Sequence, residues 1–429
     1  MKTYIQPPRS EWKALCERPV FDTSALTPQV MEVLNAVKNR GDAALRELTL
    51  RFDGCTLDGF EVAQDEKERA YAQIDPALAD AIALAAQNIA RFHQTQNNPE
   101  TAVETLPGVK CWRENRGIER VGLYIPGGSA PLFSTLLMLG VPAKLAGCPE
   151  IVLATPPRRD GSVDPTVLYA ASVIGIDTVY KIGGAQAIAA LAYGTESIQP
   201  VFKIFGPGNQ YVTRAKELIQ LDGVAIDLPA GPSEVLVIAD ASCNPVFVAA
   251  DLLSQAEHGI DSQVVLVATN QAIAEAVLAE VATQLEALPR RGIAAAALEN
   301  SRVLCFASID DALDFSNAYA PEHLILASEQ ADAWLSQIVN AGSVFVGNYS
   351  CESAGDYASG TNHTLPTNRL ARSYSGVSLD SFVKKITFQK LSREGLQAIG
   401  PAIECMAEAE QLIAHRNAVT VRLNADNNV

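Results

Sequence analysis

The sequence has 429 residues, of which 48% are hydrophobic and 19% charged, so the chain can form roughly two to four domains with sizeable cores. Its formal net charge of −16 would repel a phosphate backbone, which excludes nucleic acid as an expected partner. The N-terminus has no apolar core of signal-peptide length, and the most apolar segment, 130–147, contains Pro142 and Lys144. That segment is typical of a buried helix, so we expect a soluble cytoplasmic protein without a membrane partner. The eight cysteines stand singly, which is typical of reduced and mostly buried thiols.

The pattern to about residue 100 is mostly helical, with a clear helix over 76–94 that has Asp75 as its N-cap and Pro76 as its first residue. From residue 120 onward, short apolar runs alternate with helical runs, which predicts parallel sheets covered on both faces. The expected strands are 121–126, 150–156, 178–184, 201–206, 234–240, 263–269, 302–308, 323–328 and 342–347. These are too many for one compact sheet, so we expect two α/β units. The stretch of about 400–421 is a separate helical pattern that could pack on a partner.

A helix is predicted to start at Asn244 as N-cap and Pro245, and to end before Gly259. Gln255 and His258 are then three residues apart on its last turn, where two side chains can share a metal ion. The alternative is a polar helix end, because a histidine near a helix C-terminus is favoured by the helix dipole.

Two other stretches contain histidines. The long segment 351–367 is rich in Gly, Ser, Thr and Asn and contains Asp356 and His363, so it is either a site loop or a surface loop. Glu410 and His415 are five residues apart on the C-terminal helical pattern, roughly 140° apart around the axis, and the alternative there is a solvated helix face.

Three glycine turns, 126–131, 183–189 and 206–212, each follow an expected strand and open a helical pattern. Their backbone amides could receive phosphate groups, although none matches the usual dinucleotide or P-loop fingerprint. A fourth turn, 229–234, contains Ser233, which is either a ligand contact or part of the turn.

Glu322 and His323 stand side by side where a strand is expected to begin. Adjacent residues point to different sides of a strand, so a direct contact between these two side chains is not expected. The alternative is a polar strand entry. Four of the five histidines lie in the stretches described above. Together with Gln255 and Asp356 they offer a mixture of nitrogen and oxygen donors that suits a cation such as Zn²⁺ or Mn²⁺.

Together these segments resemble the histidinol dehydrogenase family. The matching stretches are VGLYIPGGSAPLFST, GGAQAIAALAYGTE, KIFGPGN, IDLPAGPSEVLVIAD, DLLSQAEHG, PEHLI, GSVFVG, ESAGDYASGTNHTLPT and AEQLIAHRNAV, in the expected order from about residue 30 onward. The resemblance implies a zinc enzyme that oxidises L-histidinol to L-histidinaldehyde and then to L-histidine, the last steps of histidine biosynthesis, with two NAD reduced.

The resemblance also implies a fold of two Rossmann-like parallel-sheet domains, similar to aldehyde dehydrogenases, with small N- and C-terminal helical arms in a domain-swapped homodimer. The implied parts are an N-terminal arm over 1–24, a main α/β domain over 25–120 plus 233–376 with the catalytic residues, an NAD-contacting domain over 121–232, and a dimerisation arm over 377–429.

The resemblance assigns a role to each candidate residue. The implied ligands of one zinc ion per subunit are Gln255, His258, Asp356 and His415, with His415 reaching in from the partner chain. The implied NAD contacts are Tyr124, Gln186 and Asn209. Ser233, His363 and Glu410 look like substrate contacts, together with His323 and the four metal ligands. His323 is suited to act as the base in alcohol oxidation, and Glu322 to activate water for aldehyde oxidation.

Three other functions remain open. The first is a dehydrogenase of another polar alcohol such as a sulfopropanediol, although Glu410 and His363 favour histidinol because an acidic group suits a cationic amino alcohol. The second is a zinc hydrolase in which Glu322 activates a metal-bound water without NAD. The third is covalent aldehyde oxidation through Cys148 or Cys351, but neither is expected beside a histidine or a helix N-terminus.

Overall fold

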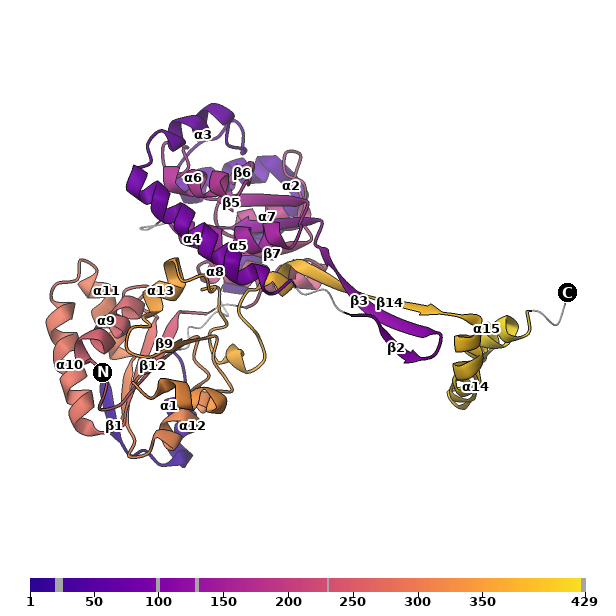
Figure 1. Ribbon diagram of the computed structural model, residues 1–429. Coiled ribbons are helices and arrows are strands. Elements are labelled where there is room, and N and C mark those ends of the chain that lie inside the picture. Colours follow the sequence, from indigo (N-terminus) through magenta and orange to yellow (C-terminus); the bar gives the residue numbers. More distant parts are fainter. Residues whose placement is uncertain (20–25, 98–100, 128–130, 230, 426–429) are drawn as a thin grey trace. The chain divides into compact units, whose positions relative to one another are not determined.

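The computed structural model describes residues 1–19, 26–97, 101–127, 131–229 and 231–425 (Figure 1). The chain divides into two compact units, one formed by Met1–Gln96 and Ile118–Phe382 and the other by Asn97–Gly117 and Val383–Val429. None of the described helices is long and apolar enough to cross a membrane.

The first sheet of the large unit is parallel and five-stranded, in the order β6-β5-β4-β7-β8. Its strands are β4 (Arg120–Tyr124), β5 (Glu150–Thr155), β6 (Thr178–Lys181), β7 (Lys203–Phe205) and β8 (Ala225–Ile226). The strand order runs outward from β4 in both directions. In open parallel sheets, ligands bind at the carboxyl ends of the strands beside such a reversal.

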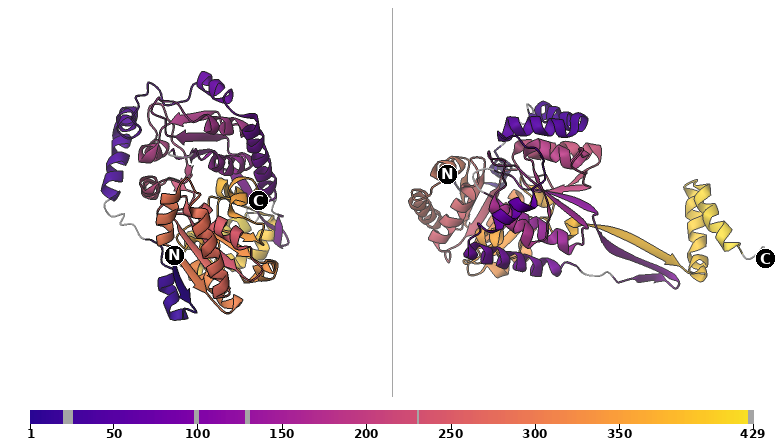
Figure 2. Two further views of the ribbon diagram at one scale, coloured as in Figure 1. Left: turned by 90° about the vertical axis from the view of Figure 1, so that its left-hand side faces the viewer. Right: turned by 90° about the horizontal axis from the view of Figure 1, so that it is seen from above.

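Helices cover both faces of this sheet (Figure 2). One layer consists of α3 (Gln64–Tyr71), α4 (Pro76–Gln94), α5 (Phe133–Leu145) and α6 (Pro165–Val173). The other consists of α2 (Leu26–Asp53), α7 (Gly184–Tyr193) and α8 (Gln210–Ile219). As predicted, Asp75 caps α4 by accepting the Ala77 N–H, and the apolar segment 130–147 contains a buried helix. Helix α2 is interrupted at Gly41, whose φ of 51° lies outside helical geometry.

The expected grouping of residues 25–120 with 233–376 differs from this arrangement. Helices α2 and α4 bury their apolar sides on the first sheet, because that sheet needs cover on both faces. Residues 97–117 belong to the small unit.

The second sheet of the large unit is also parallel, in the order β1-β11-β10-β9-β12-β13. Its strands are β1 (Lys2–Ile5), β9 (Glu234–Ala239), β10 (Gln263–Ala268), β11 (Arg302–Cys305), β12 (His323–Ala327) and β13 (Ser343–Val346). Each of the predicted strands is present in one of the two sheets. The N-terminal arm was expected to be helical, and this is wrong for residues 2–5, which form an edge strand beside β11.

Helices α9 (Pro245–Ala256), α10 (Gln271–Leu285) and α11 (Arg291–Glu299) pack on one face of this sheet. The other face is covered by α1 (Trp12–Leu15), α12 (Ile309–Tyr319) and the 3₁₀ turn Ala331–Gln337. A short helix, α13 (Glu352–Tyr357), follows β13.

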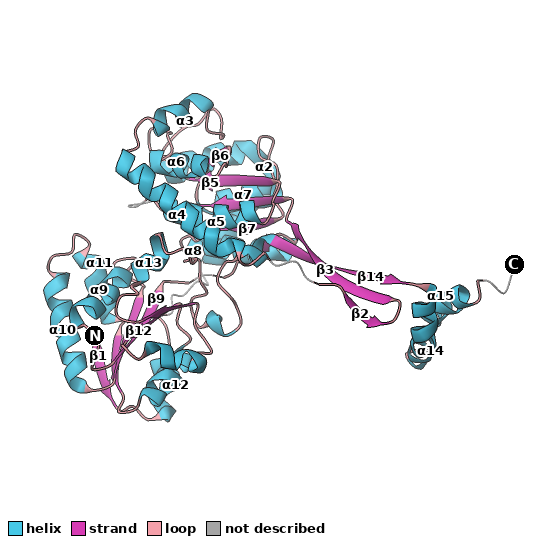
Figure 3. Cartoon of the chain, viewed as in Figure 1, coloured by secondary structure: helices cyan, strands magenta, loops and turns pink. Residues whose placement is uncertain are grey.

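The small unit combines an antiparallel sheet with two helices (Figure 3). The strands are β2 (Val103–Leu106), β3 (Val109–Gly117) and β14 (Val383–Leu391), and the helices are α14 (Arg393–Ala409) and α15 (Ile413–Leu423). None of these strands was predicted, because their apolar residues are few and stand among charged and polar ones. The expectation of one helix through Glu410 and His415 is wrong, since Gln411 has a φ of 60° and breaks it.

Candidate active site

Glu322 and His323 lie at the entrance to strand β12, and both are buried. The chain turns toward this strand at Ala320, whose φ of 55° ends α12 in the left-handed region. Glu322 Oε2 accepts the backbone N–H of Glu234 at 2.9 Å, and His323 Nδ1 lies 3.3 Å from the Glu234 carbonyl oxygen. One residue of the neighbouring strand β9 therefore contacts both side chains.

The expectation that these two adjacent side chains avoid each other is wrong. His323 Nδ1 lies 3.6 Å from Glu322 Oε2. Glu322 precedes the strand, so the alternation of side chains along β12 does not set its direction. Its bond to Glu234 turns the carboxylate back toward the imidazole ring.

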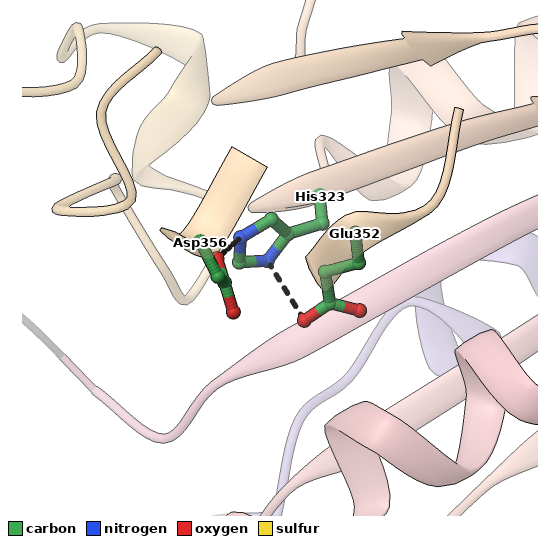
Figure 4. A group of neighbouring side chains, drawn as sticks. All are labelled: His323, Glu352 and Asp356. Atoms are coloured by element: carbon green, nitrogen blue, oxygen red, sulfur yellow. Dashed lines mark ion pairs between the residues drawn. The ribbon is translucent and has the colours of Figure 1, made fainter. Parts of the chain in front are cut away.

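Two more carboxyl groups face the His323 ring from helix α13 (Figure 4). Glu352 Oε1 lies 3.9 Å from His323 Nδ1, and Asp356 Oδ1 lies 3.7 Å from His323 Nε2. The two acids are four residues apart, which places them on one face of the helix. The three groups are close enough together to hold a metal ion. Glu352 was not singled out from the sequence, although its spacing from Asp356 in ESAGD is a signal for a shared face.

Burial and charge give these groups different protonation states. Burial raises the pKa of Glu352 to about 8, so this carboxyl is protonated at neutral pH. Burial also acts to raise the pKa of Asp356, but a hydrogen bond and positive charge from His323 lower it below its usual value. Burial acts to lower the pKa of His323, yet the surrounding carboxyl groups raise it well above that of a free imidazole. Among these carboxyl groups, Glu352 contributes most to the raised pKa of His323, followed by Glu322 and Asp356.

Helix α9 brings two further polar groups to this region. As predicted, Asn244 caps the helix by accepting the Val246 N–H, and Pro245 is the first helical residue. The helix ends at Ala256, so His258 lies just past the last turn rather than on it. The His258 N–H still donates to the Gln255 carbonyl oxygen at 3.3 Å.

The Gln255 side chain is fully buried, and neither of its amide atoms has a hydrogen-bond partner among the described residues. A buried polar group left unpaired costs about 1–3 kcal/mol, which is a reason to expect a ligand here. Helix α9 packs against α13, and His258 acts electrostatically on Asp356. The amide oxygen, imidazole and carboxylate of Gln255, His258 and Asp356 form a donor set that suits zinc.

The segment 351–367 is packed against α5 through its polar residues. Asn362 Nδ2 donates to the Met138 carbonyl oxygen at 2.6 Å, and His363 Nε2 lies 2.9 Å from Thr135 Oγ1. His363 Nδ1 lies 2.9 Å from the Asp356 carbonyl oxygen. Burial lowers the pKa of His363, so its ring is neutral at pH 7. The alternative of a solvated surface loop does not describe this part of the segment.

A cavity of about 1520 Å³ lies at the carboxyl ends of the strands of the first sheet. Its walls include Tyr124, Gln186 and Asn209, and it extends to Ser233 and His258. Glu322 and His323 are not among the described residues that line it. The cavity therefore reaches the candidate metal ligands through His258.

The glycine turns shape this cavity. The Tyr124 hydroxyl accepts the Gly184 N–H at 3.0 Å, and Gln186 Nε2 is buried without a partner in the described part of the chain. Asn209 is the N-cap of α8 through its side-chain oxygen. Gly206 has a φ of 123°, and a side chain there would collide with the Tyr124 carbonyl oxygen, so only glycine fits.

Two predicted site residues lie in the small unit. Glu410 ends α14 and His415 lies in α15, and both are exposed. Their expected roles in substrate and metal binding remain predictions.

The cysteines fit the sequence expectation in part. Cys16, Cys55, Cys148 and Cys305 are buried, whereas Cys351 and Cys405 are exposed. Burial raises the pKa of Cys148 to about 11, which argues against a thiolate nucleophile. Cys351 is the N-cap of α13, so the expectation that it lies away from a helix N-terminus is wrong.

Comparison with known proteins places these features in a family. The family model for histidinol dehydrogenase matches residues 16–423. The histidinol dehydrogenase of Bacteroides thetaiotaomicron is 56% identical over 424 residues, covering 99% of each chain, and that of Xanthomonas axonopodis pv. citri is 54% identical over 408 residues, covering 95% of each. The crystal structure of histidinol dehydrogenase from Elizabethkingia anophelis superposes with a TM-score of 0.98 at 58% identity, covering 100% of this chain and 99% of that one. The chain described here therefore belongs to the histidinol dehydrogenase family.

Proposed function

We propose that this protein oxidises L-histidinol to L-histidine through L-histidinaldehyde, with two NAD reduced, and so supplies the last two steps of histidine biosynthesis. The observation that carries the proposal is the buried Glu322–His323 pair beside Asp356, in a chain of this family. We further propose a cytoplasmic, domain-swapped homodimer with shared active sites.

Zinc is the metal that best suits the donors. Gln255, His258 and Asp356 of one chain would hold it together with His415 of the partner subunit. We favour this set over His323, Glu352 and Asp356, because the buried Gln255 amide then gains a partner and His323 keeps a free nitrogen to act as the proposed base. A bound zinc ion would orient the imidazole and amine of the substrate and neutralise the charge of Asp356.

NAD is proposed to bind in the cavity at the carboxyl ends of the first sheet, where Tyr124, Gln186 and Asn209 line the wall. The free space of about 1520 Å³ is larger than a typical small-molecule pocket of about 300–1,000 Å³, as a dinucleotide requires. NAD supplies the hydride acceptor in both oxidations. Ser233, which lines the cavity together with His258, is proposed to contact the substrate, as are His363 and Glu410.

His323 is proposed to take the alcohol proton. The Glu234 carbonyl oxygen is the natural acceptor for a proton on His323 Nδ1, which leaves Nε2 as the basic nitrogen. The raised pKa of His323 in the ligand-free chain depends partly on Asp356. When Asp356 is engaged in binding, that attraction weakens and the ring can begin the reaction neutral.

Glu322 is proposed to activate the water that converts the aldehyde to a gem-diol before the second oxidation. Its Oε2 is occupied by the Glu234 N–H, and a carboxylate has a second oxygen with which to accept a proton from water. Two bases next to each other can thus serve two successive steps.

The test of the proposal is the amount of NADH formed from a limiting amount of L-histidinol, measured at 340 nm. We expect two NADH per histidinol, loss of activity with a chelator, and recovery with added Zn²⁺. Sulfopropanediol under the same conditions serves as the control substrate and should give no NADH. Absence of NADH with histidinol, or one NADH per histidinol at completion, would contradict the proposal.

A further inference from the structure

Glu234 orients both proposed bases through its backbone. It is the first residue of β9, and its N–H and C=O both point toward the start of β12. The N–H donates to Glu322 Oε2 at 2.9 Å, and the carbonyl oxygen lies 3.3 Å from His323 Nδ1. A shift of this one residue would therefore misdirect the carboxylate and the imidazole together.

The Glu234 side chain is fixed by an arginine from the N-terminal segment. Arg18 Nε donates to Glu234 Oε2 at 2.6 Å and Arg18 Nη2 donates to Oε1 at 2.8 Å, which is the two-pronged geometry that binds a carboxylate most firmly. The ion pair is buried, with side-chain exposures of 8% for Arg18 and 1% for Glu234. Removal of one partner of a buried ion pair is strongly destabilising, because it leaves a buried charge unpaired.

Arg18 is itself held on several sides. Its guanidinium donates to the carbonyl oxygens of Cys16 and Tyr319 at 2.8 and 2.9 Å and stacks over the Tyr319 ring at 3.5 Å. Tyr319 is fully buried, and its hydroxyl donates to Gln263 Oε1 at 2.8 Å. Gln263 begins β10, so this network joins the amino ends of β9 and β10 to the end of α12.

We infer that the Arg18–Glu234 ion pair is a positioning element for the reaction. It sets the geometry of Glu322 and His323 through the backbone of Glu234. The Glu234 carboxylate is taken up by Arg18, and the Glu234 backbone contacts both bases, so the ion pair acts through the two bases rather than on substrate. The two hydrogen bonds from the Arg18 guanidinium hold Glu234, the first residue of β9, in place. The N–H of that residue then holds one oxygen of Glu322, and its carbonyl favours the proton on His323 Nδ1, so that Nε2 faces Asp356.

This inference rests on the proposed function, and the experiment separates the two. The variants are Arg18→Lys, which keeps the charge but loses the fork, Arg18→Met, and the double variant Arg18→Met/Glu234→Gln, which removes both charges and leaves none unpaired. For each variant, kcat and KM are measured separately with histidinol and with histidinaldehyde, along with zinc content and Tm. The wild-type chain must first give NADH from histidinol, and its failure to do so would count against the proposed function only.

In the folded double variant, we expect kcat to fall about tenfold or more in both oxidations, with zinc content unchanged and KM within about twofold. Arg18→Lys should retain more activity than Arg18→Met. If the double variant does not fold, the decision rests on Arg18→Lys, for which an unchanged kcat would overturn the inference. A lowered Tm with kcat unchanged in both oxidations would also overturn it, because it would assign the ion pair to stability alone.

A matched control is the Lys181–Glu66 ion pair, which joins strand β6 to helix α3 with an N–O distance of 3.1 Å and side-chain exposures of 14% and 15%. The double variant Lys181→Met/Glu66→Gln removes an ion pair whose residues are distant in sequence from Glu322 and His323. It should lower Tm without changing kcat of either oxidation. An equal loss of kcat in this control would show that any lost ion pair slows the enzyme, and the inference would fall.

Discussion

At the scale of single residues, the proposed site depends on two bases that share one support. Glu322 and His323 are adjacent in sequence and lie 3.6 Å apart, yet each is bonded to a different atom of Glu234. Their chemistry also differs, since a carboxylate can deprotonate water while an imidazole near neutral pH can exchange a proton with an alcohol. The pair is therefore suited to a reaction with two oxidations.

This division of labour gives a prediction at the residue scale. Glu322→Gln keeps the shape of the side chain but removes the base, so we expect the alcohol step to be spared and the aldehyde step to slow by about 10²-fold or more. His323→Asn or His323→Ala should slow both steps. The measurement is single-turnover NADH formation with histidinol and with histidinaldehyde. If Glu322→Gln slows both steps equally, the assignment of separate roles is wrong even for a histidinol dehydrogenase.

At the scale of elements, the site is assembled from helix ends and strand starts. Helix α9 supplies Gln255 from its last turn, α13 supplies Glu352 and Asp356 from one face, and β12 begins with His323. These groups lie at the amino ends of the second sheet, whereas the cavity lies at the carboxyl ends of the first.

The last residue of helix α2 is a partly buried acid, and it gives a prediction about pH. This residue, Asp53, lines the cavity, one of its oxygens has no partner among the described residues, and burial raises its pKa from 3.8 to about 6. An acid whose pKa is higher in the folded chain destabilises the fold as it ionises. The destabilisation is absent below pH 3.8 and complete above about pH 6. The negative charge also opposes the dipole at the helix C-terminus.

We therefore expect Asp53→Asn to raise Tm at about pH 7.5 and to leave it unchanged near about pH 4, as measured by scanning calorimetry. The control is Glu32→Gln, at an exposed acid earlier in the same helix, which should change Tm at neither pH. A Tm gain of the same size at both pH values would indicate that the charge of Asp53 is not the cause.

At the scale of the whole molecule, the small unit buries few apolar side chains, and among its described residues these are Val109, Ala407 and Val419. It leaves several large apolar side chains exposed, namely Ile386 at 41%, Met406 at 65%, Leu412 at 44%, Ile413 at 56% and Val421 at 53%. An apolar surface of this kind is typical of a segment that packs on a partner. It supports the proposed homodimer, in which His415 of the partner subunit completes the metal site.

Subunit mixing tests the shared site. Chains with His415→Ala and chains with His258→Ala are each expected to be inactive as homodimers. In a heterodimer one of the two sites regains all its ligands, so we expect activity and zinc content of roughly half the wild-type value per dimer. The control is a mixture of two differently tagged His258→Ala chains, which should stay inactive. Lack of rescue in the His258→Ala and His415→Ala heterodimer would mean that each site is built from one chain.

The sequence by itself determined the features that depend on local chemistry. Short continuous apolar runs predicted nine strands, and each is present in one of the two parallel sheets. A buried parallel strand needs apolar side chains on both faces, which makes such runs recognisable. Asn244 and Pro245 predicted the start of α9 through a cap that acts over two residues. The motifs in their order were enough to indicate the family and its candidate residues.

Only the tertiary structure decided which distant residues meet. Arg18 and Glu234 are 216 positions apart, and the strand β1 finds its partner β11 near residue 302. No periodicity encodes such pairs, because they result from packing of whole elements on a sheet. The same is true of Glu352, whose burial and raised pKa come from its neighbours in space. Local signals thus fixed the elements and the motifs, while long-range packing fixed the geometry and protonation of the site.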